Sequence, residues 1–412
     1  MHSGTNLPAI GGYNQAVVLD AVRHAPEGIS RVELAARTGL SAQTITNVCR
    51  RLLAEGLVEE AGTTTGQVGK PRTLLRLLAT GRYAVGVQLD PSMITAVLLD
   101  LAGGVVGRSR AIAPVDPAAA VAAIAEAVDD LIAGSGIAPE RLLGVGIATP
   151  GPIDAERGIV LHPPLMPGWH DVPLRDLLID RLGLPVLFEK DVTAAAVGQR
   201  WIDPSGAGDA FAFFYYGTGT GMGLVVDGAV LRGAGGNAGD SGHLLVGGSA
   251  ECVCGRRGCL GPSILPWRLL GDARVPTSEA EASDVMARFA ALAARADADE
   301  ASARSVLDAA ADAIATALVA VVNLLDLDHV VFGGPFWHPV SRYLLDRVPG
   351  AVRDSPALVS VRTLSFAESA LGADVAAVGA ACLVLDHALA PRPSALLIPP
   401  AGADRATGAA IT

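Results

Sequence analysis

Residues 30–60, SRVELAARTGLSAQTITNVCRRLLAEGLVEE, carry the pattern of two short helices joined by a tight turn. Ser30 is a candidate N-cap, and Glu33 three residues later completes a capping box for the first helix. Gly39 suits the positive φ angle of a tight turn, and Ser41 is placed to cap the second helix. The stretch therefore predicts a helix-turn-helix.

The second helix of this motif has one apolar and one polar face. The apolar positions follow helical spacing and include Cys49, which is therefore expected in the core; they are Ile45, Val48, Cys49, Leu52 and Leu53. The opposite face carries Gln43, Thr44, Thr46, Asn47, Arg50 and Arg51. Amides and hydroxyls near a helix start suit base edges in the major groove, and arginines further along suit phosphates. An ordinary helical hairpin with a polar outer face is the alternative.

Two strands with a Gly- and Thr-rich connection follow this helix. The segments GLVEE and RTLLRLL, joined by AGTTTGQVGKP, predict a β-hairpin wing. Lys70 and Arg72 lie at its base, where they are expected to reach phosphates or the minor groove, although both also fit solvated surface charges. The predicted contacts with double-stranded operator DNA are Ser41, Gln43, Thr44, Thr46, Asn47, Arg50, Lys70 and Arg72.

The charge of the chain is uneven. Residues 1–80 hold eight Lys/Arg and six Asp/Glu, whereas the whole 412-residue chain holds 31 and 42 and has a formal net charge of −11. Only the first part is therefore suited to an anionic polymer. Charge alone fits a solvated acidic surface without any partner equally well.

Two features bear on the cellular compartment. No uninterrupted apolar run reaches the length of a membrane span, because Asn323 and two aspartates break the longest candidate. The N-terminus lacks the basic region and apolar core of a signal peptide. The sequence therefore predicts a cytoplasmic protein without a membrane partner.

From Tyr83 onwards, short strands and helices alternate. YAVGVQL, ITAVLLDL and GVVGRSRA read as three successive strands, which a helix and the buried strand LLGVGIAT follow. The same order of strands and helix occurs again nearer the C-terminus, which predicts an α/β protein with two lobes and a cleft between them. The tail after Leu389 is rich in Pro, Ala and Gly and is expected to be poorly ordered.

Residues 242–263, GHLLVGGSAECVCGRRGCLGPS, hold three of the five cysteines. His243, Cys252, Cys254 and Cys259 form a Cys₃His set with no position left for water, which is typical of a structural Zn²⁺ site. A group of free thiols beside a coincidental histidine is the alternative. The other two cysteines are scattered, so the sequence does not predict a disulfide framework.

Three stretches carry a family resemblance. GIATPGPIDAERGIVLHPPLMPGWHDVPLRDLLIDRLGLPVLFEKDVTAAAVG, GTGTGMGLVVDGAVLRGAGGNAGDSGHL and CVCGRRGCL resemble the signatures of the ROK family of repressors, open reading frames and sugar kinases. With the N-terminal motif, the chain resembles the regulator branch of that family. The resemblance implies an α/β fold in which a winged helix-turn-helix precedes a two-lobed, actin-like (ribonuclease-H-like) ROK domain. The expected domains are residues 1–80 for DNA binding, 81–198 for the first lobe, 199–390 for the second lobe with the zinc loop, and a tail at 391–412.

The chain departs from the kinases of this family at the phosphate site. Those kinases place an aspartate and paired glycines in the turn after the first strand, where Gln88, Asp90 and Pro91 stand here. Glutamine cannot supply the carboxylate of a magnesium–phosphate network, and proline has no N–H to give to phosphate. Asp191 matches the family's catalytic base, but a lysine and a threonine replace the asparagines beside it. Asp191 is therefore expected to be inactive, and the chain is not expected to be an enzyme.

The sugar contacts of the family are also incomplete. Leu165 replaces a sugar-binding asparagine, Asp240 replaces a longer glutamate, and Gly261 replaces a further sugar-binding glutamate. Each lost polar partner costs on the order of 1–3 kcal/mol. The resemblance still implies an effector site around Gly151, Asp191, Asp240 and His243. Its expected ligand, if the site has one, is a sugar or a sugar derivative.

Together these features predict a sequence-specific DNA-binding transcriptional regulator, a repressor of sugar-related genes, with a degenerate and non-catalytic sugar-kinase-like domain. Half-sites related by a two-fold axis require a homodimer or a homotetramer. Two alternatives stay open. One is an ATP-dependent sugar kinase that carries a DNA-binding head. The other is a regulator whose ROK domain binds a non-sugar ligand or a protein partner.

Overall fold

The computed structural model describes residues 7–63, 71–203, 208–273, 282–359 and 362–389 of the chain. The expected tail at 391–412 lies outside these residues. The chain divides into two compact units. One is built mainly from residues 1–83, and the other comprises residues 84–99 and 105–384.

Three helices and a small sheet form the N-terminal unit. They are α1 (Leu7–Arg23), β1 (Ile29–Ser30), α2 (Arg31–Thr38), α3 (Ala42–Ala54), β2 (Val58–Thr63), β3 (Thr73–Leu77) and the 3-10 helix η1 (Ala79–Gly81). The strands pair antiparallel in the order β1-β3-β2. This arrangement is a winged helix-turn-helix, which confirms the sequence prediction, although the short strand β1 was not foreseen.

The predicted caps are present in this unit. Ser30 Oγ accepts a hydrogen bond from the Glu33 backbone N–H at 3.3 Å, and Glu33 Oε2 accepts one from the Ser30 N–H at 2.9 Å. Gly39 ends α2 in the left-handed conformation at φ 70°, where a side chain would be strained. Ser41 Oγ caps α3 by accepting from Thr44 N–H. The boundaries of both helices therefore follow from local chemistry.

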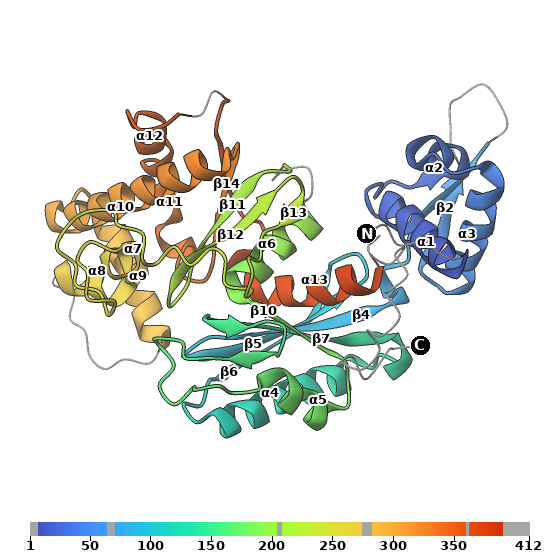
Figure 1. The fold of residues 1–412 in the computed structure, drawn as a ribbon, viewed down its shortest axis with the longest axis horizontal. Helices are drawn as coiled ribbons and strands as arrows, with labels where there is room; N and C mark the ends of the chain where they lie inside the picture. Colours follow the sequence, from blue (N-terminus) through green and yellow to red (C-terminus); the bar gives the residue numbers. More distant parts are fainter. Residues whose placement is uncertain (1–6, 64–70, 204–207, 274–281, 360–361, 390–412) are drawn as a thin grey trace. The chain divides into compact units, whose positions relative to one another are not determined.

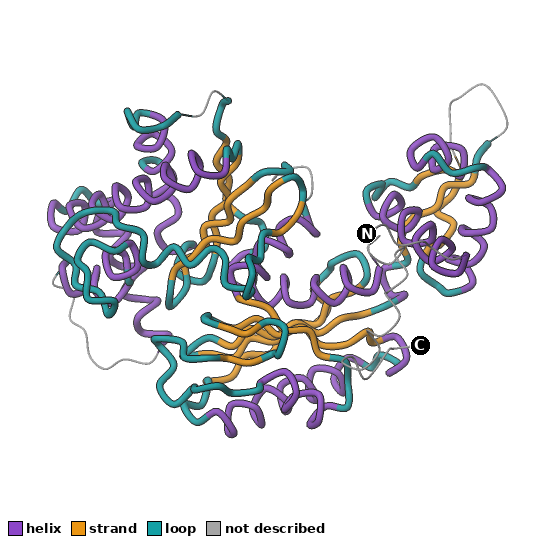
Figure 2. The backbone as a smooth tube through the Cα atoms, in the orientation of Figure 1, coloured by secondary structure: helices purple, strands orange, loops and turns teal. Residues whose placement is uncertain are grey.

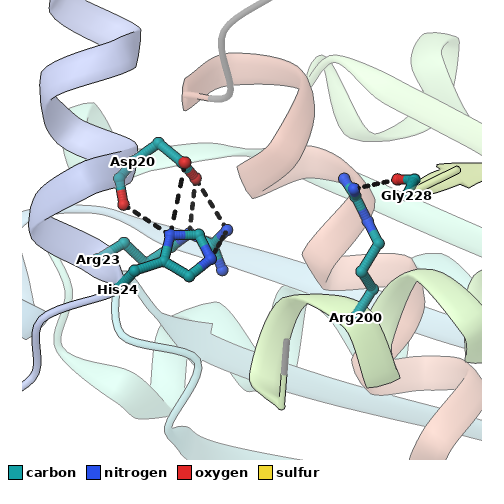
Figure 3. Close-up of polar contacts among 5 residues, drawn as sticks. All are labelled: Asp20, Arg23, His24, Arg200 and Gly228. Atoms are coloured by element: carbon teal, nitrogen blue, oxygen red, sulfur yellow. Dashed lines mark hydrogen bonds and ion pairs between the residues drawn. The ribbon is translucent and has the colours of Figure 1, made fainter. Parts of the chain in front are cut away.

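The apolar faces of the three helices and of β3 meet in one core. Its fully buried members include Val18, Leu34, Ile45, Cys49 and Leu75, so the core position predicted for Cys49 is confirmed. At the end of α1, Arg23 Nη2 donates to Asp20 Oδ1 at 2.9 Å, and His24 Nδ1 lies 2.8 Å from the Asp20 carbonyl oxygen (Figure 3). These contacts close the last turn of α1, where positive charge also suits the helix dipole.

The first lobe of the larger unit is a mixed sheet with helices on both faces. Its elements are β4 (Tyr83–Leu89), β5 (Met93–Asp100), β6 (Val105–Ile112), α4 (Pro117–Ser135), η2 (Pro139–Arg141), β7 (Leu142–Thr149), β8 (Ile153–Asp154), β9 (Ile159–Val160), α5 (Leu174–Leu182), β10 (Val186–Lys190) and α6 (Asp191–Ile202). The sheet order is β10-β7-β4-β5-β6, while β8 and β9 form a separate pair. In Figure 1, α4 and α5 lie on one face of this sheet and α13 lies on the other.

The second lobe repeats this plan. Its elements are β11 (Phe211–Tyr216), β12 (Thr220–Val226), β13 (Ala229–Val230), α7 (Leu260–Ile264), α8 (Pro266–Asp272), α9 (Ala282–Asp297), α10 (Ala301–Leu325), β14 (His329–Gly333), η3 (His338–Val340), α11 (Ser341–Leu345), α12 (Val348–Arg353), β15 (Ser365–Glu368), η4 (Gly372–Asp374) and α13 (Val375–Leu389). Its sheet order, β15-β14-β11-β12-β13, places the strands in the same succession as the first lobe. Figure 2 shows helices on both sides of each sheet. The predicted duplication is thereby confirmed.

Two helices connect the lobes at a close crossing. A Cβ atom placed on Gly379 of α13 would lie 1.8 Å from the Ala194 carbonyl oxygen of α6, and one on Gly198 of α6 would lie 2.9 Å from Gly379 Cα. Helix α6 packs against β11 and β12 of the second lobe. Helix α13 lies against the first-lobe sheet, where a Cβ on Gly86 or Gly146 would meet its backbone. The glycines therefore allow a backbone-to-backbone crossing at the junction of the lobes.

The second lobe has an aromatic core. The rings of Phe332 and Trp337 stack at 4.4 Å, and Phe214 meets Phe332 edge to face at 5.9 Å. Outside this core, Arg200 of α6 donates to the Gly228 carbonyl oxygen in the β12–β13 turn (Figure 3). This bond ties α6 to the second lobe at a second point.

Two helical segments have the length and mean hydropathy of a membrane span. They are Ala301–Leu325 and Gly372–Leu389, and 56% and 67% of their apolar windows are buried inside the protein. Burial against other helices and a sheet accounts for their composition, because helices in a protein core are apolar around most of their circumference.

Candidate functional site

The polar face of α3 is the first candidate surface. Gln43, Asn47 and Arg50 are exposed on it. The Thr46 hydroxyl donates to the Ala42 carbonyl at 2.8 Å, and Ser41 is used as the cap, so both serve the helix itself. Amide and guanidinium groups at this spacing present donors and acceptors of the kind that read base edges and phosphates.

One arginine of α3 has a structural role. Arg51 Nη1 donates to Gln15 Oε1 of α1 at 3.1 Å, which joins the two helices. In the wing, Arg72 is exposed just before β3, whereas Lys70 lies outside the described residues. The structure therefore places Arg72 beside the hairpin and leaves the predicted role of Lys70 as a prediction.

A cavity of about 280 Å³ lies between the two lobes of the larger unit. The four residues expected to surround an effector, Gly151, Asp191, Asp240 and His243, all line it. They come from the end of β7, the start of α6 and the loop after β13. The volume is suited to one small molecule.

The wall of this cavity is largely apolar where the family's sugar contacts would be. Leu165, Gly261 and Pro262 line it, together with Pro150, Pro163, Pro164 and Leu265. Helix α7 begins at Leu260, so Gly261 lies in its first turn and provides no side chain. This part of the wall offers few side-chain partners to the hydroxyl groups of a hexose, which agrees with the departures seen in the sequence.

The end of β4 and the turn after it are held by hydrogen bonds to the second lobe. Gln88 Nε2 donates to the Tyr215 hydroxyl at 2.6 Å, and Thr218 Oγ1 donates to Asp90 Oδ1 at 2.9 Å. Burial raises the pKa of the Asp90 carboxyl and that of the Tyr215 hydroxyl. The positions that would cradle a phosphate are thus occupied by paired protein groups.

Asp191 has an unusual environment at the base of the cavity. Burial raises the pKa of its carboxyl to about 6, although the Lys190 ammonium and the Val192 N–H both act to lower it. Lys190 is 5% exposed, and its Nζ lies 3.5 Å from the Asn237 carbonyl oxygen. The two side chains form no ion pair within the described part of the chain. Desolvation of the carboxyl therefore outweighs the attraction of the Lys190 ammonium.

The structure brings the four predicted metal ligands together. One ligand atom from each of His243, Cys252, Cys254 and Cys259 lies within 4.8 Å of the other three. Cys254 Sγ and Cys259 Sγ are 3.7 Å apart, and Cys252 Sγ is 3.3 Å from His243 Nδ1. In tetrahedral coordination, Zn–S bonds of about 2.3 Å separate two sulfurs by roughly 3.8 Å. The set can therefore hold a metal ion of this size.

The loop around these ligands is built for a tight approach. Gly258 has a φ of 76°, and a Cβ there would lie 2.5 Å from the Gly247 carbonyl oxygen. A hydrogen bond from the Arg256 N–H lowers the pKa of Cys254, while burial raises that of Cys259 to about 11. A bound dication would favour the deprotonated thiolate form of both cysteines. The loop and the ion are therefore expected to stabilise each other.

A model of the ROK family matches residues 84–387. The chain belongs to the ROK family. A model of the MarR family matches residues 11–65, which hold most of α1 together with α2, α3 and β2. Both matches confirm the family and the N-terminal winged helix that the sequence predicts.

Relatives of the chain include repressors and kinases. The xylose repressor of Caldicellulosiruptor bescii is 29% identical over 56% of this chain and 59% of its own. A glucokinase of Halalkalibacterium halodurans is 31% identical over 61% of this chain and 80% of its own. The chain spans 54–64% of the length of the first curated relatives it matches.

Solved structures show the same fold. The crystal structure of a ROK family transcriptional regulator, a homolog of the E. coli MLC protein, superposes with a TM-score of 0.74 and 22% sequence identity. The superposition covers 92% of this chain and 98% of that chain. It confirms the predicted architecture of a winged helix followed by a two-lobed ROK domain.

Several residues at the ROK cavity escaped prediction. Tyr215, Glu251 and Val253 line it, and Thr218 binds Asp90 beside it. Glu251 and Val253 belong to the loop that carries the Cys₃His set, so their position follows once that loop is known to border the cavity. Tyr215 reads as an ordinary strand residue, and only its pairing with Gln88 across 127 positions of sequence distinguishes it.

Proposed function

We propose that this chain is a sequence-specific transcriptional regulator, a repressor of sugar-related genes, whose ROK domain senses a small molecule and does not phosphorylate it. One observation carries the proposal. An exposed Gln43–Asn47–Arg50 face in a winged helix shares a chain with a ROK domain whose phosphate turn is filled by Asp90. Xylose repressors among the relatives support the assignment to sugar-related genes.

Genome-wide mapping of bound DNA, followed by gel-shift assays with the recovered fragments, tests this function. We expect tight binding to a small number of fragments that weakens steeply with salt, since phosphate contacts release counterions. Replacement of both Asn47 and Arg50 by alanine is expected to abolish it. Absence of any salt-sensitive, specific binding would contradict the proposal.

A sugar kinase is the second candidate, because a glucokinase is among the relatives and Asp191 keeps the position of the family base. ADP release with a panel of hexoses separates the two functions. We expect no release above background. Release that disappears in Asp191→Asn would favour the kinase. A thermal-shift screen with sugars, sugar phosphates and unrelated metabolites then tests whether the cavity takes a sugar, another ligand or none.

Further parts of the proposal concern the metal, the assembly and the compartment. We infer that Zn²⁺ occupies the Cys₃His set with a structural role, that the protein works in the cytoplasm, and that it forms a homodimer or homotetramer. The donor set and its spacing support zinc. A two-fold assembly matches the symmetry of paired half-sites, and mass measurement in solution tests it.

A further inference from the structure

Two strand ends from different lobes, with the turns that follow them, are joined by side-chain hydrogen bonds. The first lobe contributes Gln88 at the end of β4 and Asp90 in the β4–β5 turn, and the second lobe contributes Tyr215 at the end of β11 and Thr218 in the β11–β12 turn. We name these four residues the interlobe clasp. Both of its bonds run from one lobe to the other, so relative movement of the lobes at this point must break them.

The Gln88–Tyr215 bond of the clasp is deeply buried. Gln88 is 5% exposed and Tyr215 is 2% exposed. If the lobes separate without admitting water, the amide and the hydroxyl are left unpaired in a medium of low polarity, which is unfavourable for both. The closed arrangement is therefore favoured whenever the cleft stays dry.

The Asp90–Thr218 bond is held in a fixed geometry. Asp90 Oδ1 also accepts from the Ser92 N–H at 3.1 Å and from the Ser92 hydroxyl at 2.8 Å. Its carboxylate thus lies between the two turns, and Pro91 beside it has no N–H to offer. A polyphosphate would meet a like charge and too few donors there. The clasp closes this space to nucleotides.

The clasp also borders the effector cavity. Asp90 and Tyr215 line that cavity, so a ligand inside it lies against the clasp itself. Other contacts bridge the lobes: Arg232 Nε donates to Glu189 Oε2 at 2.6 Å, and the Ile153 N–H donates to Asn237 Oδ1 at 2.8 Å. Loss of the clasp is therefore expected to loosen the lobes and not to separate them.

We propose that the interlobe clasp joins the lobes of the ROK domain without a nucleotide and that it is the contact that breaks when the lobes move apart. This inference rests on the proposed function, because a ROK domain that phosphorylated its ligand would need this space for a nucleotide. At the glycine crossing, the backbones of α6 and α13 are in direct contact and leave no room for displacement. The crossing therefore acts as the pivot about which the lobes move. The clasp, made of two side-chain bonds, is the contact that can release.

Hydrogen exchange in the full-length protein tests the clasp directly. Tyr215→Phe and Thr218→Val each remove one bond, and Thr218 lies in a turn, where the change is mild. Both variants should raise the amide exchange rate of residues 88–93 and 215–221 about fivefold, as expected for the loss of one hydrogen bond. Exchange that stays at the unmodified rate in both variants would overturn the clasp.

Two matched controls remove similar bonds within the second lobe. Tyr216→Phe removes the bond from the Tyr216 hydroxyl to the Ile264 carbonyl, and Thr316→Val removes one to the Asp312 carbonyl. Neither should alter exchange of residues 88–93 in the first lobe, which is the segment to compare because Tyr216 itself lies within residues 215–221. If Tyr216→Phe loosens both turns as strongly as Tyr215→Phe, the effect is general destabilisation and the proposal fails.

A further measurement completes the test. Millimolar Mg-ATP should leave exchange in both turns unchanged, and protection by Mg-ATP would overturn the claim that no nucleotide is needed. Absence of specific DNA binding in the unmodified protein would instead contradict the proposed function and leave the exchange result standing.

Discussion

Asp191 shows how burial, more than a neighbouring charge, sets the chemistry of a residue. Its carboxyl has a pKa of about 6 in the folded protein, above the value of about 4 for an aspartate in an unfolded chain. The folded state therefore binds a proton more tightly than the unfolded state. Stability from this group is complete below pH 4 and is lost as the pH rises through 6.

The variant Asp191→Asn makes this effect measurable. Asparagine cannot ionise. The unfolding free energy of the variant should therefore not decrease between pH 4 and pH 7.5 in the way that this group makes the wild type's decrease. The variant should therefore gain about 2–3 kcal/mol relative to the wild type across that range. Urea unfolding at several pH values measures the difference. Asp130→Asn, on the exposed face of α4, serves as the control. Parallel pH profiles for Asp191→Asn and the wild type would contradict the pKa.

Sequence reasoning succeeded for residues whose partners are near in the chain. The capping pairs and the four metal ligands lie within a short stretch, so their spacing reveals the geometry. It did not indicate the raised pKa of Asp191, because the desolvation that causes it arises only when the lobes are packed. It also missed Tyr215, because the partner Gln88 lies in another lobe.

At the scale of elements, α3 carries the expected recognition surface. Arg50→Ala should weaken binding to all DNA sequences to a similar degree and reduce the salt slope by about 1, since it removes one phosphate contact. Asn47→Ala should instead relax the preference at one base position by about 1–3 kcal/mol. Gel shifts at several salt concentrations on matched and mutated sites measure both effects.

A control for α3 is available outside the winged helix. Arg157 is an exposed arginine of the first lobe, paired with Asp154 at 3.8 Å. Arg157→Ala removes the same charge from the protein but not from the recognition surface. Loss of affinity equal to that of Arg50→Ala would mean that total charge, and not α3, determines binding.

The loop that carries the Cys₃His set belongs to neither sheet of the ROK domain. Isolated bridges order its backbone, Leu245 with Cys259 and Glu251 with Arg257, together with hydrogen bonds such as that from the Val246 N–H to the Gly258 carbonyl at 2.8 Å. We expect about one tightly held Zn²⁺ per chain, and its removal should lower the melting temperature and expose amides of the loop. Elemental analysis and hydrogen exchange after chelation measure this. Cys254→Ser should mimic the loss, whereas Cys49→Ser, in the winged-helix core, should retain the metal. Metal-free protein with an ordered loop would contradict the prediction.

At the scale of the whole molecule, the ROK domain is a duplication that sequence patterns can reveal. Strand order agrees between the lobes, since both sheets run fifth, fourth, first, second, third. The sequence indicated this through repeated strands. It did not indicate the helix crossing, because Gly198 and Gly379 look like ordinary helix glycines until α6 and α13 meet.

The close crossing of α6 and α13 leads to a prediction about stability and about the connection between the lobes. A Cβ on Gly379 would lie 1.8 Å from the Ala194 carbonyl oxygen and 2.4 Å from its carbon, and neither backbone atom can move aside alone. Gly379→Ala should therefore destabilise the protein by about 1–3 kcal/mol, as overpacking does. Gly134→Ala, in α4 with open space around its Cβ, should be neutral or stabilise by up to about 1 kcal/mol through helix propensity. Thermal unfolding compares the two. Because the crossing is the pivot of the clasp, Gly379→Ala should also raise exchange in both clasp turns. A Gly379→Ala protein as stable as the Gly134→Ala control would show that α6 and α13 are not held at this distance, and the pivot would have to lie elsewhere.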